Sequence, residues 1–210
     1  MTQALILDFD GVICQTETFK LDQMAVYFRE LGLQVEPRRL YQMAGGTYME
    51  KEQVLDRIFI GQPRYREVKE LALNFHTAPF PYSALLTPGI TQTLETVRSR
   101  GISMGVASNS RQERLRSALE SCGILSFFKY TESAFDLGMR KPDPWVYTHI
   151  MEKIGVKPQS CIIIEDSTIG IEAGKASGAR VVALRDRDGA IDQSMADYII
   201  TRIEDILNYL

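Results

Sequence analysis

The feature that most constrains this chain is a short apolar run near the amino terminus that ends in two carboxylates and a glycine. Residues 4–12 read ALILDFDGV, and such a continuous apolar run is typical of a strand that is buried on both faces of a sheet. Because side chains alternate along a strand, an extended backbone through Asp10 would point Asp8 and Asp10 to one side and Phe9 to the other. Two carboxylates at contact distance repel by about 4 kcal/mol at an effective dielectric of about 20, so such a pair needs a proton or a cation. The alternative is a strand followed by an ordinary Asp-Gly turn.

The composition is that of a globular protein, and it restricts the expected partners. The chain has 210 residues, 45% of them hydrophobic and 24% charged, which suits one domain or one domain with an insertion. The net charge is −3 and no basic run occurs, so neither nucleic acid nor a membrane surface is an expected partner. No apolar stretch approaches the length of a membrane span.

The cysteines and the first residues bear on the compartment. The three cysteines are far apart and form neither a disulfide framework nor a zinc spacing, which suits a reducing environment. The chain runs from Met1 directly into the apolar strand without a basic leader segment, so we expect a cytoplasmic protein. Nothing in the sequence demands an oligomer, and we expect a monomer.

Residues 14–84 carry helical spacing and turn residues without a strand pattern. The expected helices cover residues 16–31, a short stretch after residue 37, residues 47–60 and residues 64–75. Thr16 is expected to cap the first of them, and Gly45-Gly46 breaks the chain before the third. We therefore predict a small, all-helical cap domain over residues 14–84.

From residue 85 onward, helical and strand patterns alternate. The expected strands cover residues 102–107, 127–131, 161–164, 180–184 and 198–200, the last at a sheet edge. Ser110 and Glu113 are expected to form a capping box at the start of one of the intervening helices. Strands that alternate with helices imply right-handed crossovers and a mainly parallel sheet. The predicted fold class is α/β, a doubly wound catalytic core of residues 1–13 and 85–210 with the cap inserted between them.

Polar residues follow several of the expected strands at the point where each strand ends. They are Asp8, Asp10, Ser108, Asn109, Glu165 and Asp166, and Lys141 lies on a loop that leads into a later helix. In open α/β sheets, ligands bind beyond the carboxyl ends of the strands, so we expect these side chains to converge on one site. Taken singly, each has a structural explanation: a turn, a helix cap or a solvated surface lysine.

Such a site would be suited to phosphoryl transfer. The carboxylates of Asp8, Asp10, Glu165 and Asp166 concentrate negative charge, and oxygen ligands without histidine or cysteine favour Mg²⁺ over zinc. One aspartate can act as a covalent nucleophile, and a second can protonate the leaving oxygen and later deprotonate water. A metal ion and Lys141 would neutralise the oxygens of the transferring group.

The residues at positions 8–12 resemble the first motif of the haloacid dehalogenase superfamily, and the resemblance covers nearly the whole chain. It implies a Rossmann-like core with a helical cap inserted after this motif. It also implies that Asp8 is the nucleophile, that Asp10 is the general acid and base, and that the backbone carbonyl of Asp10 binds the metal. The activity implied is a Mg²⁺-dependent phosphatase that acts on a small phosphorylated metabolite through an aspartyl-phosphate.

Three later motifs match the same superfamily in the same order along the chain. Ser108, with Asn109 beside it, matches the residue of the second motif that binds the transferring phosphate. Lys141 matches the lysine of the third motif. Glu165 and Asp166 match the acidic fourth motif, which helps to hold Mg²⁺.

The departures from the family pattern bear on the activity. The nearest group includes phosphatases and β-phosphoglucomutases, and the cap loop of the mutases has a lysine before its glycine and an arginine three residues after it. Here residues 45–49 read GGTYM, so both cations are missing, which favours a phosphatase. Lys20 or Lys51 could replace them, so a sugar-phosphate mutase stays the alternative. The group also often has Asp-Ser or Asp-Thr and then a histidine beyond the first motif, where this chain has Gln15, Thr16 and Lys20.

Two other classes of protein can be weighed against an enzyme. A nucleotide-binding domain would need a glycine-rich phosphate loop, and neither common form of that loop follows an expected strand. A receiver-like signalling module also forms an aspartyl-phosphate, but it would not explain a helical insertion beside the nucleophile. An insertion of this kind suits a lid that excludes water and opens for release, with hinges expected near residues 12–15 and 81–87. The sequence does not specify the substrate.

Overall fold

The computed structural model describes residues 2–33, 35–43, 48–61, 64–75, 79–186, 189 and 191–210. The predicted cap loop at residues 45–47 lies outside the described residues, as do the side chains of Tyr48 and Met49. Among the described residues, no helix is long and apolar enough to cross a membrane. The cytoplasmic location and the monomeric state stay predictions from the sequence.

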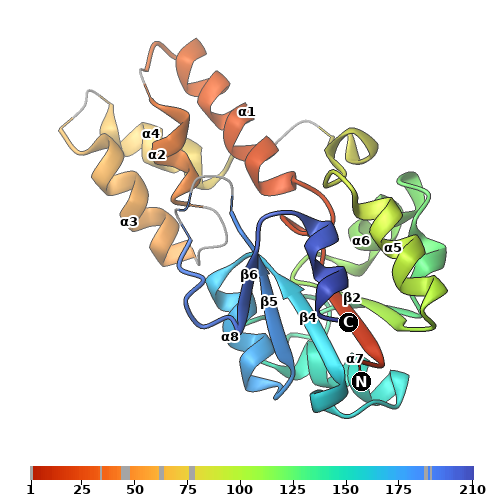
Figure 1. The fold of residues 1–210 in the computed structure, drawn as a ribbon. Coiled ribbons are helices and arrows are strands. Elements are labelled where there is room, and N and C mark those ends of the chain that lie inside the picture. The colour runs from red at the N-terminus through yellow and green to blue at the C-terminus, as the bar shows by residue number, and fades with distance from the viewer. Residues whose placement is uncertain are drawn as a thin grey trace.

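A parallel sheet forms the centre of the structure (Figure 1). Among the described residues it has six strands in the order β3-β2-β1-β4-β5-β6. Their bounds are β1 (Ala4–Asp8), β2 (Ser103–Ser108), β3 (Tyr130–Ser133), β4 (Cys161–Glu165), β5 (Arg180–Leu184) and β6 (Tyr198–Ile200). The direction in which the chain adds strands reverses between β1 and β4, which is where doubly wound sheets bind ligands. The predicted α/β class and the edge strand at residues 198–200 are confirmed.

The first strand is buried at the middle of this sheet. All five residues of β1 are buried, and Leu7 pairs with Val106 of β2 on one side and with Ile164 of β4 on the other. Leu5 and Leu7 pack on one face of the sheet, whereas the intervening Ile6 packs on the opposite face. The apolar run is therefore the buried, two-sided strand that its composition predicts.

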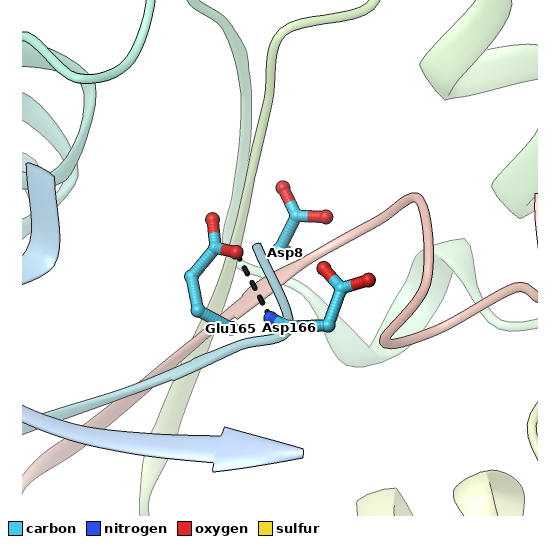
Figure 2. A group of neighbouring side chains, drawn as sticks. All are labelled: Asp8, Glu165 and Asp166. Carbon is cyan, nitrogen blue, oxygen red and sulfur yellow. Dashed lines mark hydrogen bonds between the residues drawn. The ribbon is translucent and has the colours of Figure 1, made fainter. Parts of the chain in front are cut away.

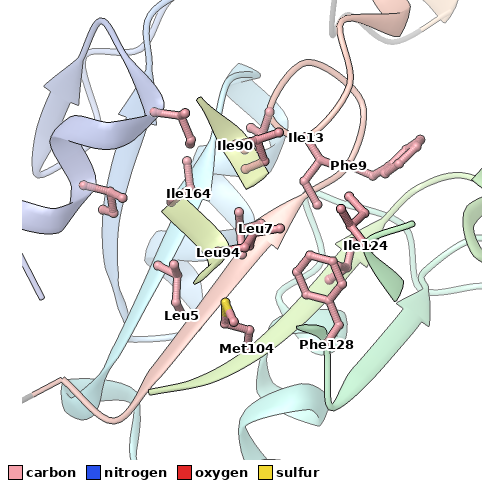
Figure 3. Packing of buried hydrophobic residues seen from close by; sticks show 14 of the residues in the cluster. Leu5, Leu7, Phe9, Ile13, Ile90, Leu94, Met104, Ile124, Phe128 and Ile164 are labelled. Atoms are coloured by element: carbon pink, nitrogen blue, oxygen red, sulfur yellow. The ribbon is translucent and has the colours of Figure 1, made fainter. Parts of the chain in front are cut away.

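Helices cover both faces of the sheet. On one face, α5 (Ile90–Ser99), α6 (Gln112–Ser121) and the 3₁₀ turn η4 (Ile203–Asn208) contribute to one hydrophobic cluster with β1 and β2, part of which Figure 3 shows. On the other face lie α7 (Trp145–Ile154) and α8 (Thr168–Ala176). Shorter 3₁₀ turns are η1 (Tyr82–Leu85), η2 (Leu125–Phe127) and η3 (Pro158–Ser160). Because η2 occupies its start, the strand predicted at residues 127–131 begins only at Tyr130.

The inserted segment contains helices and no strand among its described residues. It contains α1 (Thr16–Glu30), α2 (Pro37–Tyr41), α3 (Tyr48–Phe59) and α4 (Tyr65–Leu73), which Figure 1 shows grouped to one side of the sheet. These helices bury a hydrophobic cluster of their own, in which the rings of Phe28 and Phe59 meet edge to face at 5.2 Å. The assignment of residues 14–84 to a separate domain stays a prediction.

Two predicted capping residues have other partners. Thr16 is the first residue of α1, whose N-cap is Gln15, and the Thr16 hydroxyl donates to the carboxylate of Asp10. Ser110 precedes the N-cap of α6, which is Arg111, and the Ser110 hydroxyl donates to the same carboxylate at 2.8 Å. Both capping predictions are wrong because each helix begins one residue away from the expected position, so neither hydroxyl belongs to an N-cap residue.

Candidate active site

The predicted site residues lie at the carboxyl ends of neighbouring strands, around one cavity. Asp8 ends β1, Ser108 ends β2 and Glu165 ends β4. The cavity has a volume of about 210 Å³, and the predicted residues that line it are Asp8, Asp10, Asn109, Lys141 and Asp166. Ser108 and Glu165 are buried next to these residues in the chain without lining the cavity themselves. The convergence expected from the sequence is therefore present.

Lys141 places a buried ammonium group between two carboxylates. Its Nζ contacts Asp8 Oδ1, lies 2.6 Å from Glu165 Oε1 and donates to the carbonyl oxygen of Ala107 at 3.0 Å. Its backbone N–H donates to Asn109 Oδ1 at 3.0 Å, which fixes the loop against the end of β2. Although burial lowers the pKa of Lys141, the charges of Asp8 and Glu165 raise it above its ordinary value. The lysine is therefore charged.

The carboxylate of Glu165 is fully buried and its oxygens are occupied by hydrogen bonds. Oε1 accepts from Lys141 and, at 2.7 Å, from the hydroxyl of Tyr147. Oε2 accepts from the backbone N–H groups of Asp166 at 3.0 Å and Ser167 at 3.2 Å. Burial raises the pKa of Glu165, but the charge of Lys141 and the hydrogen bonds from Lys141, Tyr147 and Ser167 together hold that pKa below its ordinary value. Glu165 is therefore an ionised residue that fixes Lys141.

Three carboxylates gather beside this lysine. Asp8, Glu165 and Asp166 each offer one oxygen, and these oxygens lie within 4.8 Å of one another (Figure 2). Burial raises the pKa of Asp8 to about 8 even though Lys141 acts in the opposite direction. Burial and the charge of Glu165 raise the pKa of Asp166 well above its ordinary value. Three ionised carboxylates would carry more negative charge than one lysine neutralises, so the acids of the cluster hold protons unless a cation binds. Their oxygen-only donor set fits a hard divalent cation such as Mg²⁺.

Two glycines leave room for these carboxylates. Gly11 has a φ of +98°, and a Cβ at this position would lie 1.9 Å from Asp166 Oδ2. A Cβ at Gly170, in the first turn of α8, would lie 1.9 Å from Glu165 Oε1. A side chain at either position would displace an acid of the cluster, so the glycines that follow the first and fourth motifs have a steric role.

Asp10 lies outside this cluster and has partners of its own. Its Oδ1 accepts from the Nη2 of Arg114 at 2.8 Å and from Thr16, and its Oδ2 accepts from Ser110 at 2.8 Å. The two aspartates of the first motif thus line one cavity with different cationic partners, Lys141 for Asp8 and Arg114 for Asp10. Whether the backbone carbonyl of Asp10 binds a metal stays a prediction.

The sequence reasoning missed Arg114 and Tyr147. Arg114 lies one helical turn beyond Ser110 on α6, which is the only sequence signal that it faces the same site. Tyr147 lies on the buried face of α7 and has the sequence pattern of a core residue. The cap also contributes side chains to the cavity, namely Glu17 of α1 and Lys51 of α3.

The comparison with known families agrees with the fold. The family model described as haloacid dehalogenase-like hydrolase matches residues 5–184, which include the ends of β1, β2 and β4. The chain belongs to the haloacid dehalogenase-like hydrolase family. The resemblance drawn from the motifs is confirmed.

Individual relatives cover almost the whole chain. The phosphorylated carbohydrates phosphatase of Thermotoga maritima is 27% identical over 229 residues, which cover 99% of this chain and 98% of that protein. Hexitol phosphatase B of Escherichia coli is 28% identical over 189 residues, which cover 86% of this chain and 82% of that protein. The crystal structure of a hydrolase of this family from Deinococcus radiodurans, with bound phosphate and sodium, has a TM-score of 0.77 at 23% identity. It covers 98% of this chain and 93% of that chain, which shows a shared fold.

Replacing Lys141 by methionine tests the electrostatic account of the site. The variant leaves two buried carboxylates without their cation, so we expect the free energy of unfolding to fall by about 3–5 kcal/mol in metal-free buffer. Urea unfolding measures this change. The control is Lys153→Met, which removes a surface ion pair with Glu132 and is expected to have an effect below about 1 kcal/mol. Equal losses in both variants would contradict the account.

Proposed function

We propose that this protein is a Mg²⁺-dependent phosphatase that hydrolyses a small phosphorylated metabolite, such as a sugar phosphate, through an aspartyl-phosphate. The observation that carries the proposal is the ammonium group of Lys141 between Asp8 and Glu165, at the edge of a small cavity lined by acids. The family membership supports hydrolysis. A relative that is named a phosphatase of phosphorylated carbohydrates supports the substrate class.

Asp8 is the nucleophile in this proposal. One of its oxygens is held by Lys141, so the other can attack phosphorus as the bond between phosphorus and the leaving oxygen breaks. Lys141 and the amide of Asn109 lie at the cavity and would stabilise the negative charge on the phosphoryl oxygens. Ser108 keeps the phosphate-binding role that the family resemblance implies; here its hydroxyl accepts from the N–H group of Ser110 at 3.0 Å.

Asp10 acts as the acid and then as the base. It protonates the leaving oxygen while the aspartyl-phosphate forms, and it takes a proton from the water that then attacks the phosphorus. This second attack releases phosphate and restores the carboxylate of Asp8. The separate environments of Asp8 and Asp10 support this division, since only Asp8 belongs to the acidic cluster.

The acidic cluster suits a magnesium ion. Asp8 and Asp166 would hold the ion directly, while Glu165, whose oxygens already accept hydrogen bonds, would hold Lys141 in place. When bound, a divalent cation supplies positive charge that polarises the phosphoryl group. It would also relieve the repulsion among the three buried carboxylates.

A sugar-phosphate mutase is the second candidate because a cap cation faces the cavity. Lys51 of α3 lines it, whereas Lys20 does not. A mutase must bind a second phosphate away from the nucleophile, and Lys51 is the cap lysine placed to do so. Because the cap loop at residues 45–49 has neither cation of the mutases, hydrolysis is favoured.

Removing the nucleophile is the direct test of the proposed reaction. We expect Asp8→Asn to lower kcat by about 10⁴-fold or more, because it abolishes the covalent step while retaining the shape of the side chain. Steady-state phosphate release measures kcat, and circular dichroism checks the fold. Asp143→Asn, an exposed position outside the cavity, is the matched control and should retain full activity. A folded Asp8→Asn enzyme with substantial turnover would refute the covalent mechanism.

Removing divalent metal tests the cofactor. A chelator should stop turnover, and Mg²⁺ should restore it. Because an ion that binds only the folded state stabilises it, Mg²⁺ at about 100 times its Kd should add about 2.7 kcal/mol to the free energy of unfolding. The same titration on Asp166→Asn should show little stabilisation. Turnover that survives chelation, together with an unfolding free energy that Mg²⁺ leaves unchanged, would rule out the assignment.

A further inference from the structure

Arg114 contacts more than the carboxylate of Asp10. Its Nη2 lies 2.8 Å from Asp10 Oδ1, and its Nη1 contacts the hydroxyl of Ser110, which itself donates to Asp10. On its other edge, Nε donates to the hydroxyl of Tyr82 at 2.9 Å. The guanidinium carbon lies 5.0 Å from the ring centroid of Phe80. One side chain therefore joins the proposed acid and base to a pair of aromatic rings.

These rings lie where the chain passes between the cap and the core. We call Phe19, Phe80 and Tyr82 the aromatic hinge. Phe80 and Tyr82 stack at 5.6 Å in the segment that follows the cap helices, and Phe80 meets Phe19 of α1 at 5.7 Å. Tyr82 also packs at 6.0 Å from Phe9, the buried residue between the two aspartates. The aromatic hinge therefore joins the segment that enters the cap helices, at Phe19, to the segment that follows them, at Phe80 and Tyr82.

The shape of the guanidinium is what allows these contacts together. Arginine has five N–H donors in a rigid, planar fork, and it stacks on aromatic faces. The pair is partly buried, with 34% of the Arg114 side chain and 20% of the Asp10 side chain exposed. Both residues line the cavity. This ion pair differs from a solvated surface pair because it fixes the orientation of the Asp10 carboxylate, which lines the cavity.

We propose that Arg114 is a positioning residue that fixes the carboxylate of Asp10 at the cavity and ties its orientation to the aromatic hinge. The inference rests on the proposed function, in which Asp10 transfers protons. Arg114 acts through Asp10 and not on the phosphoryl group, which Lys141 and Asn109 are placed to hold. The position of the cap and the orientation of the Asp10 carboxylate are then linked through the side chain of Arg114.

The leaving group reveals whether Arg114 acts through Asp10. The leaving oxygen of p-nitrophenyl phosphate departs without a proton, whereas the more basic leaving oxygen of phenyl phosphate gains from protonation in the transition state. Replacing a residue that orients Asp10 should therefore slow the release of the leaving group more for phenyl phosphate than for p-nitrophenyl phosphate. A residue that merely supports the fold affects both substrates to the same extent.

The experiment measures kcat/KM, which reports the steps up to release of the leaving group, for both substrates in Arg114→Met. We expect the loss on phenyl phosphate to exceed the loss on p-nitrophenyl phosphate by about tenfold, a part of the 10²–10⁴-fold that general acid catalysis contributes. Arg116→Met is the matched control, because Arg116 lies on the same helix, is 62% exposed and pairs with Glu120 at 3.0 Å. It should leave both values of kcat/KM unchanged.

A double variant separates positioning from an independent role. Asp10→Asn alone should lower kcat/KM on phenyl phosphate by about 100-fold or more. Adding Arg114→Met to it should change kcat/KM by less than about twofold, because residues that act as a unit are not additive. Tyr82→Phe removes only the hydroxyl that accepts from Arg114. It should also cause a greater loss on phenyl phosphate than on p-nitrophenyl phosphate, with a smaller difference than in Arg114→Met. It provides the test if Arg114→Met does not fold.

The outcomes are distinguishable. Equal losses on the two substrates in Arg114→Met or Tyr82→Phe, or full additivity with Asp10→Asn, would overturn the inference about Arg114 while the proposed function stands. The absence of leaving-group selectivity in Asp10→Asn itself would instead remove the acid role of Asp10, and the inference with it. A greater loss on phenyl phosphate in Arg114→Met, Tyr82→Phe and Asp10→Asn, without additivity in the double variant, supports both the acid role of Asp10 and the positioning role of Arg114.

Discussion

The rest of this site depends on a single buried ammonium group. Lys141 meets Asp8 at the end of β1, the carbonyl of Ala107 in β2 and Glu165 at the end of β4, so one cation joins three adjacent strands. Each of these charged groups would be several kcal/mol unfavourable if it were buried alone, and mutual pairing is what makes the burial tolerable. Two further hydrogen bonds hold the ammonium group in place. Tyr147 donates to Glu165, and the backbone N–H of Lys141 donates to Asn109. The position of the Asp8 carboxylate therefore follows from the pairing of buried charges at the point where the strand order reverses.

The same principle separates the two aspartates of the first motif. Asp8 lies among acids beside Lys141, in surroundings that favour a proton or a cation, whereas Asp10 lies against Arg114 and two hydroxyl groups. Phe9 is fully buried between them and anchors both. Carboxylates that are close in sequence but differ in surroundings are suited to different chemical roles. In this protein those surroundings come from α1, α6 and the loop before α7, which are distant from one another in the chain.

Sequence reasoning was most successful where a local pattern sufficed. The apolar run of β1, the alternation of helices and strands and the polar residues at strand ends gave the fold class and brought the site residues together, because periodicity and strand ends are local properties. The partners of Asp10 were not predictable in this way. Thr16 and Ser110 look like helix caps in sequence, and Arg114 like one charge on an amphipathic helix; only the tertiary structure brings all three to one carboxylate. The strand order likewise depends on long-range pairing. Which side chains of the inserted segment reach the cavity also depends on how that segment packs on the core, and Glu17 and Lys51 are the ones among the described residues that line it.

The central claim is that Asp8 carries the phosphoryl group during turnover. Asp10→Asn should slow the hydrolysis of the intermediate more than its formation from p-nitrophenyl phosphate, since that leaving group needs no proton. Rapid mixing of this variant with p-nitrophenyl phosphate, followed by acid quenching and peptide mass analysis, is the most direct measurement. The account predicts a burst of about one p-nitrophenol per active site. It also predicts that the peptide containing Asp8 gains the mass of one phosphoryl group. Turnover without a burst, or a phosphoryl group on any other residue, would contradict it.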